Sequence, residues 1–323
     1  MDPGVDQDQG LTPSGEVAPS GEVAAAGEVA AGRRPAAVTR LSGMLHRHPR
    51  VRLAGLLSAP MLWLVVVYLG SLGVMLATAF WSVDSFTGNL IRVWSLDNLR
   101  TLVTDEVYRT VALRSVGVAV AVTVVDAVIA FPMAFFMAKV ASVRLQRVMV
   151  AAVLTPLWAS YLVKAYAWRA MLSDDGVLNW ALKPLGLHGP GFGVTATAVT
   201  LAYLWLPYMI LPIYAGLQRL PDSLLEASGD LGATSGRTLR AIVLPLVFPS
   251  VVAGSIFTFS LSLGDYIAVK IVGGSTQLFA NVIYDNIGVA SNLPFAAAAA
   301  FFPVLLIVLY LTLVRRTGAL ENL

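Results

Sequence analysis

The chain has 323 residues, of which 57% are hydrophobic and only 13% are charged, with a formal net charge of +3 at pH 7. Its mean hydropathy is +0.74. A water-soluble fold of this length cannot bury so many long apolar runs, so the composition excludes a soluble domain and predicts a polytopic membrane protein. The chain contains no cysteine, which excludes disulfides, thiolate metal sites and a cysteine nucleophile.

The sequence pI of about 9.2 would suggest a nucleic-acid partner in a soluble protein. In a membrane protein, however, Lys and Arg gather on the cytoplasmic flanks of the spans. We therefore expect these residues to neighbour the lipid bilayer, and we expect no nucleic acid, no cofactor and no metal.

Residues 1–50 differ in composition from the rest of the chain. The sequence Gly-Glu-Val-Ala begins at Gly15, Gly21 and Gly27, a period of six, and the segment has no aromatic residue. Such a segment cannot bury enough apolar surface to offset the entropy lost on ordering, so we predict a disordered tail. A dispensable tail is favoured over a partner-binding one. It is not a signal peptide, because no apolar core follows a basic start. The arginines that come next, up to Arg52, form a basic flank suited to anionic lipid.

Residues 51–323 form the expected transmembrane domain. About 20 apolar residues cross the hydrocarbon layer as a helix, and the backbone must satisfy its polar groups internally. The stretches that qualify lie near residues 54–80, 115–138, 148–170, 193–217, 242–265 and 293–314. The sequence therefore predicts an all-α fold with six transmembrane helices.

Lys and Arg in the short loops predict the orientation in the membrane. Basic residues crowd one set of loops and the flanks of the first and last spans: Lys139, Arg144, Arg147, Arg219, Arg237, Arg240, Arg315 and Arg316. The opposite loops are richer in acidic residues. Both termini and the loop around Glu226 are therefore expected on the cytoplasmic side of a plasma membrane.

Charged residues at membrane depth are costly and mark a pathway or a pair. Asp126 lies in the middle of the second span, where Lys164 of the third span is available to neutralise it; we favour this structural pair over a role for Asp126 in the cargo pathway. Asp265 lies near the outer end of the fifth span beside Tyr266. It either contributes to a cation pathway or is an interface carboxylate that meets only water.

Aromatic residues of the third span have two interpretations. Tyr166 and Trp168 are assigned to the interfacial aromatic belt. Trp158 and Tyr161 lie nearer the middle of the span and are the candidates to line a cavity, although packing is favoured over ligand contact.

A short polar segment between the fourth and fifth spans carries the strongest motif. Glu226, Ala227, Ser228 and Gly232 are followed after a nine-residue gap by Ile-Val-Leu-Pro, which ends in Leu244 and Pro245. The segment, near residues 220–245, resembles the E-A-A loop of permease subunits in binding-protein-dependent ABC importers. Ser228 replaces the second alanine of that pattern, a small-for-small change that leaves room for close docking. We expect Glu226 to open a short helix, Gly232 to form a sharp turn and Pro245 to start the fifth span.

Two further segments resemble the spermidine/putrescine-type permeases, specifically the first of their two permease subunits. The run from Pro156 to Trp168 is similar to the third-span signature of that subfamily, with Lys164 where arginine is usual. The sequence Ser-Leu-Gly-Asp-Tyr that ends at Tyr266, with the Gly-Gly pair after it, is similar to the end of their fifth span.

The resemblance implies the type I ABC importer permease fold and a set of partners. These are ATP-binding subunits that contact the Glu226 loop, a second permease subunit, an external solute-binding protein and a small-molecule cargo such as a polyamine. The chain has no G-x-x-x-x-G-K-[ST] phosphate loop, so it is not expected to hydrolyse ATP itself.

Three other functions remain as alternatives. An intramembrane hydrolase needs a nucleophile with a base, or metal ligands, within the spans, yet the three histidines lie outside them and Asp126 and Asp265 differ in depth. A secondary transporter commonly shows internal repeats, and none is evident. A permease for another small solute is the nearest alternative.

Overall fold

The computed structural model describes residues 57–58, 60–84 and 87–315. The proposed tail, residues 1–50, lies outside them. The chain divides into two compact units, Met1–Tyr68 and Leu69–Leu323. The described residues are almost entirely helical, which confirms the all-α class. Their strands are β1 (Ser82–Val83) and β2 (Leu90–Ile91), an antiparallel pair with Ser82 opposite Ile91.

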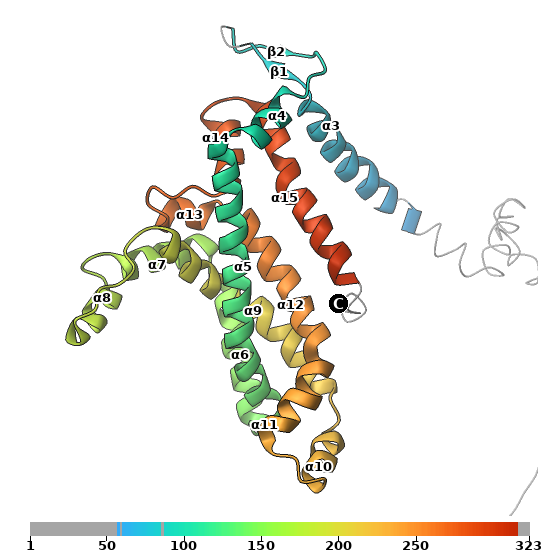
Figure 1. The fold of residues 1–323 in the computed structure, drawn as a ribbon, viewed down its shortest axis with the longest axis vertical. Helices are drawn as coiled ribbons and strands as arrows, with labels where there is room; N and C mark the ends of the chain where they lie inside the picture. Colours follow the sequence, from blue (N-terminus) through green and yellow to red (C-terminus); the bar gives the residue numbers. More distant parts are fainter. Residues whose placement is uncertain (1–56, 59, 85–86, 316–323) are drawn as a thin grey trace, which may run out of the picture. The chain divides into compact units, whose positions relative to one another are not determined.

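The helices follow one another along the chain with short connections (Figure 1). In order they are η1 (Leu64–Leu69), α3 (Gly70–Thr78), α4 (Asp97–Thr104), α5 (Glu106–Phe135), η2 (Phe136–Val140), α6 (Val143–Trp158), α7 (Tyr161–Leu172), α8 (Val177–Leu182), η3 (Lys183–Leu185), α9 (Val194–Arg219), α10 (Asp222–Asp230), α11 (Ser235–Thr238), η4 (Leu239–Val243), α12 (Leu244–Gly264), α13 (Ile267–Val272), α14 (Phe279–Gly288) and α15 (Leu293–Val314).

Five helical stretches of the described chain are long and apolar enough to cross a membrane. They are Pro60–Thr78, Glu106–Val140, Val194–Arg219, Ser235–Gly264 and Leu293–Val314. A sixth span is present only if α6 and α7 are counted together, because these two helices meet at an angle of 95°. The expected helix near residues 148–170 is therefore not straight but broken.

The break between α6 and α7 has a local cause in the backbone. Pro156 lacks an amide hydrogen and weakens the last turn of α6, and Ala159 and Ser160 then adopt extended ψ angles of 142° and 135°. Helix α7 consequently packs against α13 and the start of α9, with Ala165 and Ile271 in the shared apolar cluster.

Helices α5, α9 and α12 form the core and lie side by side (Figure 1). Small residues allow α9 and α12 to approach closely, as is common between membrane helices. A Cβ added to Gly254 of α12 would lie 3.2 Å from both the backbone Cα and the carbonyl oxygen of Met209 on α9. A Cβ on Gly216 of α9 would overlap the side chain of Ser250. The close contact between α9 and α12 therefore requires glycine at both positions.

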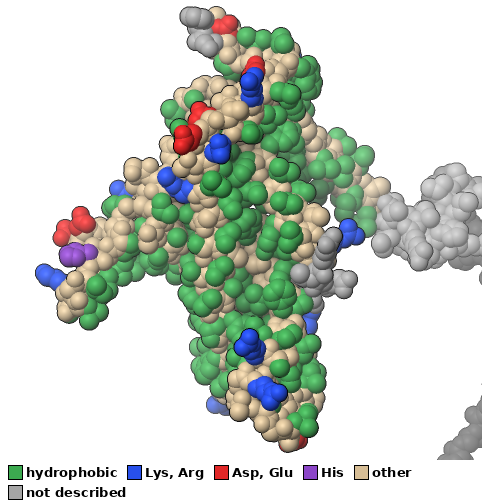
Figure 2. Space-filling view, viewed as in Figure 1, with side chains coloured by type: hydrophobic (Ala, Val, Ile, Leu, Met, Phe, Trp, Pro, Cys, Tyr) green, Lys and Arg blue, Asp and Glu red, His purple; other side chains and the backbone are tan. Residues whose placement is uncertain are grey.

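Hydrophobic side chains cover the long helices on their outer surfaces (Figure 2). Charged side chains gather instead at the ends of the bundle and on the α8 segment (Figure 2). Helices α10 and α11 lie at one end of the second unit, and α4, α14 and the β-hairpin lie at the opposite end (Figure 1). This distribution is typical of a protein that faces lipid around its middle.

Candidate functional site

The segment with the strongest motif folds as two short helices and a tight turn. Helix α10 begins at Asp222, four residues before Glu226. The expectation that Glu226 opens the helix was therefore wrong, because Asp222 follows Pro221 and Pro221 sets the start. Glu226 lies in the middle of α10 with its side chain exposed.

Gly232 ends α10 in the conformation that the sequence predicted. Its φ is +77°, in the left-handed region that glycine favours. The amide of Gly232 donates to the carbonyl of Gly229 at 2.8 Å, and the amide of Ala233 donates to the carbonyl of Ser228 at 3.0 Å. These two bonds form a Schellman motif, which satisfies the last carbonyls of the helix and turns the chain toward α11.

Ser228 was expected to lie on the docking surface of the loop, but it faces the interior of the protein. Its side chain is buried, and its hydroxyl lies 2.8 Å from the hydroxyl of Thr238 on α11. The small side chain serves packing within the chain, so it does not leave room for another protein as expected. The outward face of α10 is formed by Leu224, Ala227 and Leu231, all exposed, with Leu231 at 88%. These three residues, spaced i, i+3 and i+7, form an uncovered apolar stripe.

A contact that the sequence analysis missed ties α10 to the second span. Lys139 of η2 donates through Nζ to the carbonyl of Leu220 at 2.6 Å and to Oδ1 of Asp222 at 2.6 Å. The Lys139 side chain is only 9% exposed. The available signal was its position in the loop after the second span, yet that loop lies 81 residues from Leu220, so the pairing could not be read from the sequence.

As predicted, α12 begins at Leu244 with Pro245 in its first turn, but α12 continues a helical run that begins earlier in the chain. The helical run begins at Ser235 and continues through the π-helical turn η4 into α12. Pro245 is tolerated inside this run because η4 changes the hydrogen-bond register directly before it. Both side chains are exposed.

A cavity of about 270 Å³ lies where α7, α9 and the end of α12 meet. It contains three of the residues singled out from the sequence, Tyr161, Asp265 and Tyr266, together with Trp205. The structure thus brings together residues separated by more than 100 positions in the chain.

Asp265 is the acidic group of this cavity. It is only 8% exposed, which rules out the alternative of a carboxylate that meets only water. Oδ2 accepts a hydrogen bond from the Tyr161 hydroxyl, and Oδ1 accepts one from the backbone amide of Ala268 at 2.9 Å. Among the described residues no Lys or Arg forms an ion pair with Asp265, so its charge is balanced only by neutral donors.

The rim of the cavity is fixed by α14. The ring of Tyr266 stacks on Tyr284 with centroids 4.4 Å apart, and the Tyr266 carbonyl accepts a bond from Asn281. Lys270, the nearest cation in the sequence, is bound to Asp285 at 2.5 Å. That pairing keeps the ammonium group away from Asp265.

Trp158 and Asp126 do not join the cavity. Trp158 is the last residue of α6, directly before the break, and its side chain is 90% exposed. Asp126 is completely buried in α5, and neither oxygen has a hydrogen-bond partner among the described residues. The expected pair with Lys164 does not form, because α7 turns away from α5 at the break and packs against α13.

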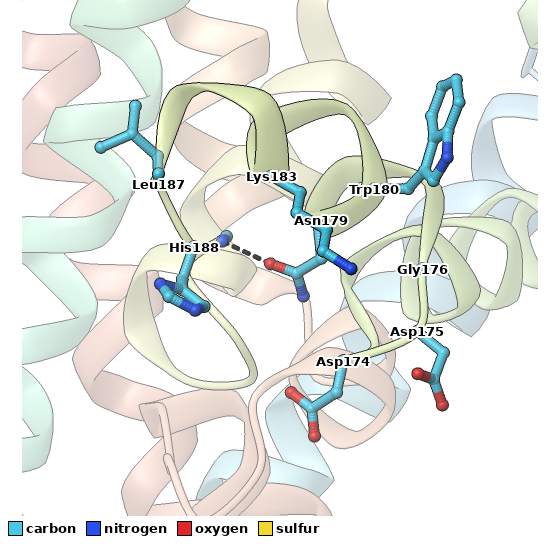
Figure 3. Close-up of a pocket in the computed structure, with 10 residues that line it drawn as sticks. Asp174, Asp175, Gly176, Asn179, Trp180, Lys183, Leu187 and His188 are labelled. Carbon is cyan, nitrogen blue, oxygen red and sulfur yellow. Dashed lines mark hydrogen bonds between the residues drawn. The ribbon is translucent and has the colours of Figure 1, made fainter.

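A larger cavity of about 570 Å³ lies within the loop between α7 and α9 (Figure 3). Asn179 closes the loop by donating to the Ser173 carbonyl at 3.0 Å and accepting from the Gly189 amide at 2.6 Å. Asp174, Asp175 and His188 line its edge (Figure 3). This cavity is local to one loop, whereas the Asp265 cavity joins three helices of the bundle. Among the described residues no three His, Asp or Glu side chains are grouped to hold a metal ion.

The chain matches a known protein family over residues 127–317, described as the binding-protein-dependent transport system inner membrane component. It is 42% identical to the inner membrane ABC transporter permease protein YdcU of Escherichia coli K12, over 88% of this chain and 95% of the relative. It is 30% identical to the spermidine/putrescine transport system permease protein PotB of the same organism, over 80% of this chain and 95% of that protein.

Solved structures with the same fold include a bacterial ABC transporter that imports the acidic polysaccharide alginate. One such chain aligns with a TM-score of 0.59 at 18% identity, over 86% of this chain and 99% of the other. A chain of the MetNI methionine ABC transporter aligns with a TM-score of 0.50 at 19% identity, over 68% of this chain and 100% of the other. At these identities the likeness shows the fold alone.

Proposed function

This chain belongs to the family of inner membrane components of binding-protein-dependent transport systems, and on that premise we propose its partners, its cargo and the roles of its two sites. It is a permease subunit of an ABC importer. An ABC importer is powered by ATP hydrolysis in separate subunits and not by an ion gradient, so this membership is inconsistent with a secondary transporter.

The cargo is a small organic cation of the polyamine type. The observation that carries this proposal is Asp265, a nearly buried carboxylate without a cationic partner among the described residues, in a cavity with the rings of Tyr161, Trp205 and Tyr266. An ammonium group gains both an ion pair and cation–π contacts in such a place. The name of the relative PotB agrees with this cargo. The fold alone does not determine the charge, because a transporter of the same fold carries an acidic polysaccharide.

The substitution Asp265→Asn tests the cargo proposal, because it keeps the shape and removes the charge. Losing a charge-assisted contact of about 1.5–3 kcal/mol should lower putrescine uptake by roughly ten-fold or more. Asp175→Asn is the matched control, since it removes the same charge from an exposed residue that lines the larger loop cavity and not the Asp265 cavity. Normal uptake by an assembled Asp265→Asn importer, or a cognate binding protein that prefers anions, would refute the proposal.

The partners are two ATP-binding subunits, a second permease subunit and an external solute-binding protein. The ATP-binding subunit docks on the apolar stripe of Leu224, Ala227 and Leu231. Leu231→Asp should abolish co-purification of the ATPase, whereas Val289→Asp, which alters an 81% exposed side chain after α14, should leave it intact. Equal co-purification of the ATPase with both variants would show that the ATPase does not dock on the apolar stripe.

Both termini and α10 face the cytoplasm. The support is the gathering of Lys139, Arg219, Arg237 and Arg240 on the elements that meet at the α10 end. Because the chain has no cysteine, single cysteines report the sidedness directly. A membrane-impermeant maleimide should label Ser291→Cys in intact cells and should label Ser223→Cys only after the membrane is opened. The reverse labelling pattern would show that α10 faces the outside of the cell and would refute the proposed orientation.

A further inference from the structure

A continuous series of aromatic rings leaves the Asp265 cavity. Tyr161 and Trp205 have ring centroids 6.0 Å apart, Trp205 and Tyr208 are 5.8 Å apart, and Tyr208 and Phe257 are 6.3 Å apart. Tyr161 comes from α7, Trp205 and Tyr208 from α9, and Phe257 from α12. Three helices therefore contribute to one row of rings.

The row leads from the cavity toward the α10 end of the protein. Trp205 and Tyr208 are one helical turn apart on α9, which ends at Arg219 beside α10. Phe257 precedes Asp265 by eight residues on α12, a distance of about 12 Å along a helix of 1.5 Å per residue. Cargo bound at Asp265 would meet these rings in order as it moves toward the end that carries α10.

No charged side chain lies along this route on either helix. Between Val194 and Gln218 of α9, and between Leu244 and Gly264 of α12, the sequence contains no Asp, Glu, Lys or Arg. A cation that leaves Asp265 thus meets no second carboxylate on these helices. The faces of the aromatic rings are the groups there that attract a positive charge.

The rings are not fully buried in the core. Phe257 is 42% exposed, whereas its neighbours Ile256 and Thr258 are buried. The Nε1 atom of Trp205 is buried and has no acceptor among the described residues, although a buried indole N–H normally finds one. No hydrogen bond therefore accounts for the placement of the Trp205 ring, which packs on one side against the apolar cluster around Val118 and Leu201. The rings of Tyr161 and Tyr208 are its aromatic neighbours.

We propose that Trp205, Tyr208 and Phe257 form an aromatic track that carries an organic cation from Asp265 toward the α10 end by successive cation–π contacts. This inference rests on the proposed function, because it requires a cationic cargo. Each contact is weak compared with an ion pair, which lets the cation leave one ring for the next instead of remaining bound. Asp265 selects a cationic cargo, and the aromatic track lets that cation move on toward α10.

Fluorination of Trp205 tests the track, since fluorine weakens the negative face of the ring and hardly changes its size. The indole nitrogen has no acceptor among the described residues, so the substitution acts through the ring face. We would incorporate mono-, di- and trifluorotryptophan at position 205 and measure uptake of labelled putrescine by the complete importer. Uptake should fall stepwise with each fluorine, by about two- to ten-fold over the series. Fluorination of Trp180, on α8 and outside the row, is the matched control.

The outcomes separate the track from the proposed cargo. A stepwise loss at position 205 with none at position 180 supports the track. Normal uptake across the Trp205 series overturns the track and leaves the cationic cargo intact. If the unmodified importer takes up no amine, the proposed cargo fails and the track fails with it. Phe257→Leu should also lower uptake, whereas Phe248→Leu, another exposed phenylalanine of α12, should not. Equal effects of these two substitutions would indicate general packing and would contradict the track.

Discussion

Replacing Gly232 with alanine should uncouple transport from ATP hydrolysis without displacing any neighbouring atom. A Cβ at this position would meet no atom within 4 Å, so the substitution causes no steric overlap. The cost arises from the backbone, because φ is +77° and a left-handed conformation costs an L-residue about 1–2 kcal/mol. A cost of that size lowers the population of the native turn by a factor of about 5–30.

Gly229→Ala is the matched control. Gly229 lies inside α10, and an added Cβ there also meets no atom within 4 Å. Alanine stabilises a helix interior by up to about 1 kcal/mol relative to glycine, so this substitution should preserve coupling or strengthen it. Gly232→Asn should restore part of the loss, because asparagine tolerates the left-handed region.

The assay is the amount of putrescine imported per ATP hydrolysed by the assembled complex, with the amount of permease in the membrane measured alongside. We expect Gly232→Ala to lower this ratio several-fold at normal membrane levels. Equal ratios for Gly232→Ala and Gly229→Ala would refute the argument that the left-handed turn positions α10.

Three further predictions concern the same machinery. Lys139→Gln should lower the amount of putrescine imported per ATP by about ten-fold, because it removes charge-assisted hydrogen bonds worth roughly 1.5–3 kcal/mol. Asp222→Asn should lower this ratio much less, since the Asp222 side chain is 75% exposed and Lys139 keeps its backbone acceptor. Equal falls of the ratio in the two variants would contradict this prediction. Glu226→Lys, which reverses an exposed charge on α10, should leave the subunit inserted and reduce uptake. Normal uptake with normal ATPase co-purification would contradict this prediction. Deletion of residues 1–40 should leave insertion and uptake nearly unchanged, and lost uptake at intact membrane levels would reveal a function for the repeats.

The sequence predicted the long helices well, because the length of an apolar run directly measures its ability to cross a membrane. It did not predict the break after Trp158, since Ala159 and Ser160 carry no strong signal and Pro156 is tolerated in many membrane helices. That break also explains the failed pair between Asp126 and Lys164, which assumed that the third span was straight.

The candidate site was predicted in part. Asp265 and Tyr161 stood out because a charge or an aromatic ring in an apolar run is unusual, but their hydrogen bond joins positions 104 residues apart and no local pattern indicates it. Trp205 and Tyr208 were missed, although their i, i+3 spacing places them on one face of α9. In an apolar span that spacing also describes ordinary packing, and the ring contacts with α7 and α12 are needed to tell the two apart.

Helix α10 is attached to the bundle at two points, and these points lead to different core helices. Near its start, Asp222 is bound by Lys139, at the end of the run that contains α5. Near its end, Ser228 contacts Thr238, at the beginning of the run that becomes α12. Helix α12 ends at Gly264, directly before Asp265, whose carboxylate accepts a hydrogen bond from the Tyr161 hydroxyl of α7. These contacts form a path by which a displacement of α10 would reach both sides of the core and, through α12, the Asp265 cavity. A chain of contacts does not by itself establish coupling. The Gly232 and Lys139 variants test for coupling directly, because they alter the attachment of α10 and change no residue of the Asp265 cavity. A fall in the amount of cargo moved per ATP would therefore show that α10 and the cavity are energetically coupled.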